Sequence, residues 1–175
     1  MPITTESVMP EPSWLVRARV DIGIKEAPGI ADNAVIVGWA RSLGYAWVAK
    51  FYAHDSIPWC ALWMAHIMHD DGKAIPPQKD VLGALNWRLW GTPLHRAVPG
   101  AVLVFTRSGG GHVGLYVGED ETHYHVLGGN QGDMVRIARV PRFQCVAIRW
   151  PSEVFPYGNP VMMAASAAPA SVTEA

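Results

Sequence analysis

The sequence has few cysteines and little net charge. Its 175 residues include two cysteines, Cys60 and Cys145, of which one begins an apolar stretch of helical period and the other lies in the strand-like run FQCVAIRW. A disulfide framework is therefore not expected, and the composition is typical of a reducing compartment. The formal net charge of −1 and the pI near 6.6 show no large excess of basic residues, so we do not expect a general nucleic-acid or anionic-membrane binder.

Long apolar runs are also absent. No stretch approaches the roughly 18 apolar residues of a membrane span, and the N-terminus MPITTESVMPEPSW has neither the basic start nor the apolar core of a signal peptide. We therefore expect a protein that is made in the cytoplasm and has no membrane span. The apolar residues, 50% of the total, are enough to bury one domain of this length.

The organisation of the chain follows from its composition and periodicity. Residues 1–12 predict a flexible arm, residues 13–158 a single domain, and residues 159–175 a disordered tail rich in alanine, serine and proline. Helices are predicted over residues 13–23, 33–44, 58–70 and 81–90, with Ser13 and Asn33 as N-caps of the first two. Strands are predicted over residues 101–106, 112–119, 123–129, 134–140 and 145–150. Helices packed on a five-stranded antiparallel sheet are an α+β fold.

Cys60 occupies a chemically favourable position at the beginning of its predicted helix. With Ser56 as the N-cap and Pro58 at the helix start, Cys60 lies in the first turn, where unpaired N–H groups and the helix dipole favour negative charge. Such a position lowers the pKa of a thiol and leaves the backbone N–H of the cysteine able to bind an oxyanion. The sequence alone leaves open that Cys60 is an ordinary small core residue.

A base for this thiol must come from outside the helix. His66 and His69 point about 240° and 180° away from Cys60 around the helix axis, so neither reaches the sulfur. His112 opens the strand HVGLYVGE, and alternation places Gly114, which leaves space, on the same face. His112 is therefore the candidate general base of an activated cysteine nucleophile.

A third residue is expected to orient the imidazole. A three-residue loop between the second and third predicted strands pairs residue 112 with Asn130, whereas a two-residue loop turns His125 onto that face, opposite Tyr116. Asn130 is preferred because its register also gathers small residues beneath the helix. A plain turn remains the other interpretation of GGN.

Several motifs together resemble a known family. They are PWCA at a helix start, PGAVLVF, GGGHVGLYVGE and VLGGNQ in successive strands, the ending IARVP and IRWP, and GIKEAPGIADNAVIVGW near the N-terminus. From about Trp14 to Pro151 the chain resembles the Cys-His cell-wall hydrolases of the NlpC-type and CHAP superfamily, in particular a small phage and prophage branch. The resemblance implies a papain-like α+β fold and hydrolysis of a peptidoglycan amide bond, with Cys60 as nucleophile, His112 as base and acid, and Asn130 as orienting residue.

One position departs from the family pattern. Many NlpC-type enzymes have a histidine as the third group, and some CHAP enzymes have a glutamate two residues before the asparagine, where this chain has Gly128. This departure therefore concerns the third catalytic residue. His54 or Asp55, just before the nucleophile, is a candidate for the oxyanion side.

Other side chains are candidates for contacts with substrate or metal. Trp59, Trp63, Trp87 and Trp90 are candidates for a groove wall, although aromatic residues at helical spacing are more often core. We keep Trp59, Asp55 and Trp90 as the candidate substrate-binding residues. No metal or cofactor is expected, because the chain lacks close cysteine or histidine pairs of finger type, although His123 and His125 share a strand face and leave weak zinc binding open.

The expected function is cleavage of cell-wall peptide through a thioester, by a monomer whose partner is peptidoglycan. An endolysin-like endopeptidase or amidase, released through a holin, carried in a virion or secreted, is the first expectation. A secreted antibacterial amidase effector with the same chemistry is the alternative in biology, and a non-catalytic module that binds cell-wall peptide is the alternative in class.

Overall fold

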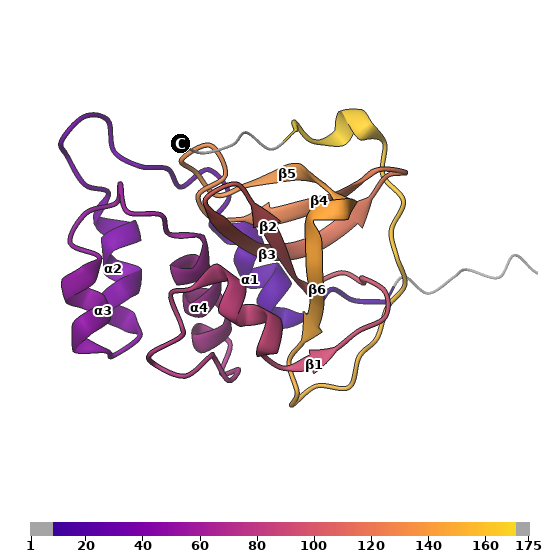
Figure 1. The fold of residues 1–175 in the computed structure, drawn as a ribbon, viewed down its shortest axis with the longest axis horizontal. Coiled ribbons are helices and arrows are strands. Elements are labelled where there is room, and N and C mark those ends of the chain that lie inside the picture. Colours follow the sequence, from indigo (N-terminus) through magenta and orange to yellow (C-terminus); the bar gives the residue numbers. More distant parts are fainter. Residues whose placement is uncertain (1–8, 171–175) are drawn as a thin grey trace, which may run out of the picture.

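The computed structural model describes residues 9–170, in which helices precede a single antiparallel sheet (Figure 1). The helices are α1 (Ser13–Val20), α2 (Ala34–Ser42), α3 (Ala46–Phe51), α4 (Cys60–Asp70) and the 3₁₀-helices η1 (Ala84–Leu89), η2 (Arg142–Gln144) and η3 (Ala165–Ala167). The strands are β1 (Thr92–Pro93), β2 (Val102–Arg107), β3 (Gly110–Glu119), β4 (His123–Gly128), β5 (Arg136–Pro141) and β6 (Cys145–Trp150). The α+β class predicted from the sequence is confirmed.

The ends of the first two helices show one correct and one wrong capping prediction. Asn33 caps α2, because its Oδ1 accepts a hydrogen bond from the backbone N–H of Val35 at 2.8 Å. Ser13 does not cap α1, whose N-cap is Pro12. The Ser13 hydroxyl instead donates to Asp71 Oδ2 at 2.8 Å, at the far end of α4. A contact with a distant helix therefore replaces the local cap.

Two other helical segments differ from the sequence prediction. The sequence gives no helix over residues 46–51, but α3 forms there and packs against α2. Val48 is the only buried residue of α3, so the segment lacks the apolar stripe that predicts a helix. The helix predicted over residues 81–90 is reduced to η1, which is bounded by extended backbone at Gly83 and Trp90.

The sheet has the strand order β1-β6-β2-β3-β4-β5, with every neighbouring pair antiparallel. The five predicted strands are confirmed, and β1 is an additional two-residue edge strand. Its Pro93 suits an edge, where a missing N–H leaves no hydrogen bond of the sheet interior unmade. Helix α4 lies between α2 and the sheet and contacts both β3 and β4 (Figure 1). Helix α4 is thereby held against the two strands that carry His112 and His125.

The hairpin of β3 and β4 changes register along its length. The pairs are Leu115 with Leu127 and Tyr116 with Val126, and then, beyond an irregularity, Gly118 with His125 and Glu119 with Tyr124. The extra residue of this bulge is Val117. The connection is a tight turn in which Asp120 N donates to His123 O at 2.9 Å. The inner register is the one that the three-residue loop predicts, although the loop itself is shorter and the bulge makes up the difference.

One continuous cluster of buried apolar side chains joins the helices to the sheet. It includes Trp14 of α1, Trp39 of α2, Trp63 of α4 and Trp150 of β6, and the rings of Trp14 and Trp150 meet edge to face at 5.0 Å. In residues 9–170, no helix combines the length and the apolar character needed to cross a membrane.

The two predicted flexible ends are partly packed. From residue 159 the sequence predicts a disordered tail, but residues 159–170 lie along the sheet. Val161 N donates to Tyr116 OH at 3.0 Å, and Met162 forms an isolated parallel β-bridge with Glu119. A Cβ on Gly118 would lie 2.2 Å from the sulfur of Met163, so this glycine makes room for the segment. At the other end, Glu11 binds Arg19. Residues 1–8 and 171–175 lie outside the described residues.

Candidate active site

Cys60 is the first residue of α4 and lies at the edge of a cavity. The N-cap of this helix is Trp59, whose side chain makes no capping hydrogen bond. Its backbone oxygen accepts the first helical hydrogen bond, from Trp63 N at 2.9 Å. The helix therefore begins two residues later than predicted, and Ser56 is not the cap. The Cys60 side chain is 5% exposed and still contributes to the cavity wall. The predicted place of this thiol in the first helical turn is confirmed.

The cavity has a volume of about 410 Å³ and combines charged and polar walls. It is lined by Glu26, Ser56, Pro58, Cys60, Leu82, Ala84, Arg107, Ser108, Gly109, Gly110, Gly111, Asn130 and Asp133. Both signs of charge are present, because a guanidinium and two carboxylates come from three different segments. A ligand in this cavity would therefore lie beside charges of both signs.

One wall of the cavity is built by two segments that pair with each other. Glu26 N donates to Asp133 O at 2.9 Å, and Val135 N donates to Ile24 O at 2.8 Å. The Glu26 carboxylate also accepts a hydrogen bond from the indole of Trp59 at 2.8 Å. The segment before α2 is thereby fixed beside the residue that precedes Cys60.

His112 is buried in β3 with its two ring nitrogens in different situations. Its Nε2 lies 3.1 Å from Gln131 Oε1, whereas its Nδ1 is buried and has no hydrogen-bond partner among the described residues. The ring stacks on Phe105, with centroids 6.3 Å apart. Burial, aided by the charge of Arg107 and opposed by the Gln131 hydrogen bond, lowers the pKa of His112 to about 4. The imidazole is therefore neutral at pH 7, with a lone pair on one nitrogen.

Two glycines bring the end of β4 close to both His112 and α4. A Cβ on Gly128 would lie 3.2 Å from His112 Nε2, and a Cβ on Gly129 would lie 2.7 Å from Cβ of Trp63. Gly111, next to His112 in β3, lines the same cavity as Cys60. The residues around the imidazole and the thiol thus share one cavity. Direct contact between the thiol and the imidazole stays a prediction.

The space expected beneath Gly114 is filled by the sheet itself. A Cβ on Gly114 would lie 2.4 Å from Cγ1 of Val126, so a neighbouring strand occupies the gap. The reasoning that this glycine leaves room for α4 is therefore wrong. The close approach of α4 occurs instead at Gly129, beyond the last residue of β4.

Asn130, the predicted orienting residue, lines the cavity but does not accept a hydrogen bond from His112. Its backbone has a φ of 54°, and its Oδ1 is buried without a hydrogen-bond partner among residues 9–170. The next residue, Gln131, makes the contact with His112 Nε2. The inner part of the predicted register is confirmed, but Asn130, whose backbone φ is positive, makes no hydrogen bond to the imidazole through its Oδ1.

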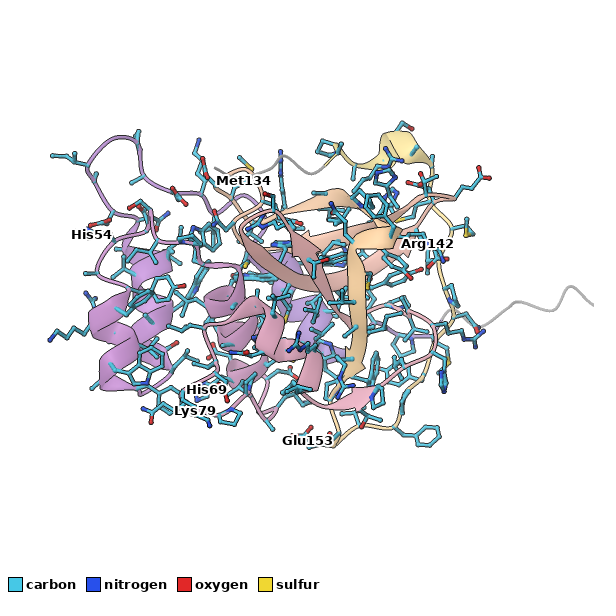
Figure 2. The ribbon with its side chains drawn as sticks, viewed as in Figure 1. His54, His69, Lys79, Met134, Arg142 and Glu153 are labelled. Atoms are coloured by element: carbon cyan, nitrogen blue, oxygen red, sulfur yellow. The ribbon has the colours of Figure 1, made fainter. Side chains whose placement is uncertain are left out.

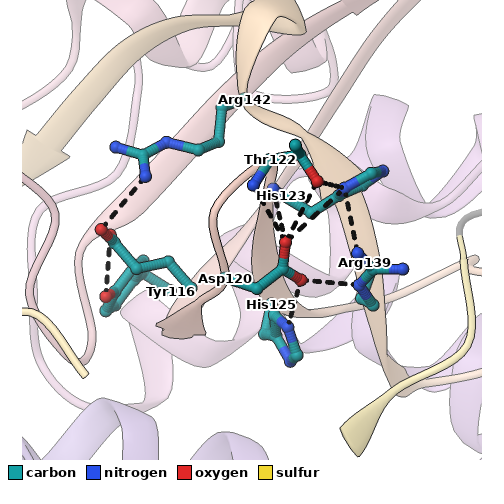
Figure 3. A network of polar contacts seen from close by, with 8 residues as sticks. Tyr116, Asp120, Thr122, His123, His125, Arg139 and Arg142 are labelled. Carbon is teal, nitrogen blue, oxygen red and sulfur yellow. Dashed lines mark hydrogen bonds and ion pairs between the residues drawn. The ribbon is translucent and has the colours of Figure 1, made fainter. Parts of the chain in front are cut away.

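His125, the other candidate for the third residue, belongs to a separate polar network (Figure 3). Its Nε2 lies 2.9 Å from Asp120 Oδ2, and Arg139 Nε donates to the same oxygen at 2.7 Å. Asp120 Oδ1 accepts from the backbone N–H groups of Thr122 and His123 at 3.0 Å. This carboxylate, whose pKa is lowered chiefly by Arg139, therefore closes the turn and binds His125.

The structure shows no metal site at His123 and His125 among residues 9–170. Both side chains lie near Asp120, but in the described part of the chain no group of three or more His, Cys, Asp or Glu side chains has the arrangement of a metal site.

The three residues predicted to bind substrate are buried and contact other parts of the protein. Trp59 is fully buried, and Trp90 donates from its indole to Ala74 O at 2.8 Å. Asp55 is buried, and its Oδ2 accepts hydrogen bonds from Ala27 N at 2.8 Å and Asn33 N at 2.7 Å. None of the three predicted residues lines the cavity described above. Aromatic residues at helical spacing form core here, and the carboxylate fixes the loop before α2.

The histidines of α4 do not belong to the site, as predicted. His66 is buried and stacks on Trp39, with ring centroids 5.3 Å apart. His69 is exposed near Asp70, and Figure 2 shows it at the periphery, as it does His54. His54 contacts Asp32, at 3.1 Å, and is not part of the cavity wall.

Sequence reasoning missed Gln131 and the charged cavity residues Arg107 and Asp133. The contact of Gln131 with His112 was not predicted, because Gln131 follows a turn and lies outside the strand whose alternation predicts the register. Arg107 is the last residue of β2, and a charged residue at the end of a strand is ordinarily interpreted as solvent-exposed. Its place beside SGGG, directly before the candidate base, was the available signal.

Comparison with models of known protein families gives no match to this chain. Comparison with curated proteins likewise gives no significant match. The family resemblance therefore rests on the motifs alone.

Proposed function

We propose that this protein is a cysteine hydrolase with a papain-like arrangement that cleaves an amide bond in the peptide of bacterial cell walls. The observation that carries the proposal is the shared cavity, to which the start of α4 contributes Cys60, β3 contributes Gly111 and the turn after β4 contributes Asn130. A small buried thiol has no structural need to lie on a cavity with charged walls. The motif resemblance to NlpC-type and CHAP enzymes points to the same chemistry.

The reaction follows from the neutral state of His112. Its Nδ1 accepts the proton of the Cys60 thiol while the sulfur attacks the carbonyl carbon of the scissile amide. The backbone N–H of Cys60, in the first turn of α4, donates to the oxygen that becomes negatively charged. The imidazolium then gives its proton to the leaving amine, and a thioester remains. Water attacks the thioester with His112 as base, which releases the carboxylic acid and restores the thiol.

The walls of the cavity suit a peptide of mixed charge. Arg107, Glu26 and Asp133 all line the cavity, so a peptide bound there would lie beside charges of both signs. Cell-wall peptides carry both kinds of group beside their amide bonds. An endolysin-like role is the first proposal for the biology, and a secreted antibacterial effector shares the same chemistry.

Digestion of purified sacculi tests the proposal. The wild-type protein is expected to release soluble muropeptides, and mass spectrometry of their new amine and carboxyl ends identifies the bond. Cys60→Ala is expected to release none. Cys145→Ala, which removes a half-buried thiol in β6, is the matched control and is expected to retain activity. A wild-type protein that binds cell-wall peptide without cleaving it would instead be the non-catalytic binding module.

A further inference from the structure

The carboxamide of Gln131 is held in one orientation by its surroundings. Gln131 is buried, and its Nε2 lies 3.0 Å from Val126 O, 3.3 Å from Gly128 O and 2.5 Å from Arg136 O. All three neighbours are carbonyl oxygens, so the nitrogen end of the amide must face them as donor. The oxygen end, Oε1, is therefore directed at His112.

This orientation fixes the position of the proton on the imidazole. Gln131 Oε1 is an acceptor, so the His112 nitrogen 3.1 Å away must carry its proton. In the neutral ring the other nitrogen, Nδ1, is then the one with the lone pair. Nδ1 is buried and has no hydrogen-bond partner in the described part of the chain, so it is the nitrogen available to a thiol.

Gly128 leaves the space that the contact between Gln131 and His112 needs. A Cβ at this position would lie 3.0 Å from Cδ of Gln131 and 3.2 Å from His112 Nε2. The carboxamide of Gln131 thus folds back into the space in front of the glycine. A side chain at position 128 would compete with the amide for the imidazole.

We propose that Gln131, rather than Asn130, is the positioning residue that holds the His112 imidazole in the tautomer able to accept the proton of Cys60. The inference rests on the proposed cysteine hydrolase activity. It assigns Gln131 no contact with substrate. Its effect is exerted through the imidazole, and it depends on the small size of residue 128.

The test substitutes Gln131→Met, which keeps the length of the side chain and removes its hydrogen bonds. On a soluble cell-wall peptide substrate, kcat is expected to fall roughly 10²- to 10⁴-fold, because the wrong tautomer of a catalytic histidine costs this much. KM is expected to stay nearly constant. Gln78→Met, the same change at an exposed glutamine, is the control and is expected to leave kcat unchanged.

A second readout does not depend on turnover. Nitrogen chemical shifts of the His112 ring report the tautomer, and in the wild-type protein they are expected to show the proton on Nε2. In Gln131→Met the Nδ1-protonated form is expected to appear. An unchanged tautomer, or an unchanged kcat, would overturn the inference while leaving the hydrolase proposal intact. Absence of hydrolysis by the wild-type protein would overturn both.

Gly128→Ala keeps the test decisive if Gln131→Met does not fold. The added methyl group displaces the amide without removing it, so the same selective fall in kcat is expected, with a smaller size. Wild-type kcat in Gly128→Ala, with the tautomer unchanged, would contradict the inference.

Discussion

Two buried histidines on neighbouring strands have the same local chemistry and different surroundings. His112 is 5% exposed and His125 is fully buried; in each, Nε2 has a side-chain oxygen partner and Nδ1 has none among residues 9–170. The partner of His112 is the neutral amide of Gln131 beside the cavity. The partner of His125 is the carboxylate of Asp120, which Arg139 and the hairpin turn also hold.

The proposed function assigns the two histidines different roles, and under it a carboxylate partner does not by itself mark the catalytic histidine. His125 has the partner expected of a catalytic histidine, but its place at the turn gives it a structural role. His112 has the weaker partner, yet its chain neighbour Gly111 lines the cavity that contains Cys60. The proposed function therefore assigns catalysis to the histidine beside the cavity and a structural role to the histidine at the turn.

The largest expected effect separates the two histidines in an activity assay. His112→Ala is expected to lower hydrolysis of cell-wall peptide about 10²- to 10⁴-fold, because the general base is lost. His125→Ala is expected to retain most of the activity and to lower the free energy of unfolding by about 1–3 kcal/mol, because a buried hydrogen bond is lost. Enzyme kinetics measure the activity of the two variants, and denaturant titration measures their free energy of unfolding. Equal loss of activity in the two variants would contradict the assignment.

The second prediction concerns the stability of the fold in acid. The pKa of His112 is about 4 in the folded protein and about 6.5 ordinarily, so between these pH values the unfolded chain binds the proton more strongly. Stability is therefore expected to fall as the pH drops from 6.5 to 4, by about 3 kcal/mol from this group. Denaturant titrations across this range measure the slope. His112→Gln should show a shallower slope, and an identical slope would be the contrary result.

The third prediction concerns the turn that holds His125. Asp120→Asn is expected to lower the melting temperature at neutral pH, because Arg139 and His125 lose a carboxylate. Since the pKa of Asp120 is lowered in the folded protein, its contribution is present above the ordinary pKa of aspartate and is lost as the pH falls towards the lowered value. Glu121→Gln, an exposed neighbour, is the control in thermal unfolding. Hydrolysis by Asp120→Asn should continue, and its complete loss would place the network in the site.

The smallest effect is expected at Asn130. Its φ of 54° is a conformation that glycine adopts without strain, so Asn130→Gly should change the free energy of unfolding by no more than about 1 kcal/mol. Hydrolysis should fall much less than in His112→Ala, because Gln131 still orients the imidazole. A loss as large as that of His112→Ala would restore Asn130 as the third catalytic residue.

The sequence predicts the strands and the place of Cys60 well because both depend on local pattern. Alternation gave the five long strands, and a cysteine after a proline at a helix start was sufficient to place the thiol. The inner register of β3 and β4 was also predictable, although the bulge at Val117 was not. A bulge arises from sheet twist and turn chemistry together, which alternation does not record.

The remaining part of the site depends on contacts between distant segments. Gln131 reaches His112 only because the chain turns through the positive φ of Asn130 and because Gly128 lacks a side chain. Asp55 looked like a substrate ligand by its nearness to Cys60 in sequence, yet it binds the backbone of residues 27 and 33. Neighbours in sequence are therefore a poor guide to the cavity wall, which five separate segments supply.

The rate at which iodoacetamide alkylates Cys60, measured against pH, tests most directly that this thiol reacts with the help of His112. The experiment uses Cys145→Ala protein, so that Cys60 is the only thiol, and compares it with the same protein carrying His112→Gln. The account predicts that loss of the imidazole lowers the rate at neutral pH and changes the shape of the profile. Superimposable profiles for the two proteins would contradict it.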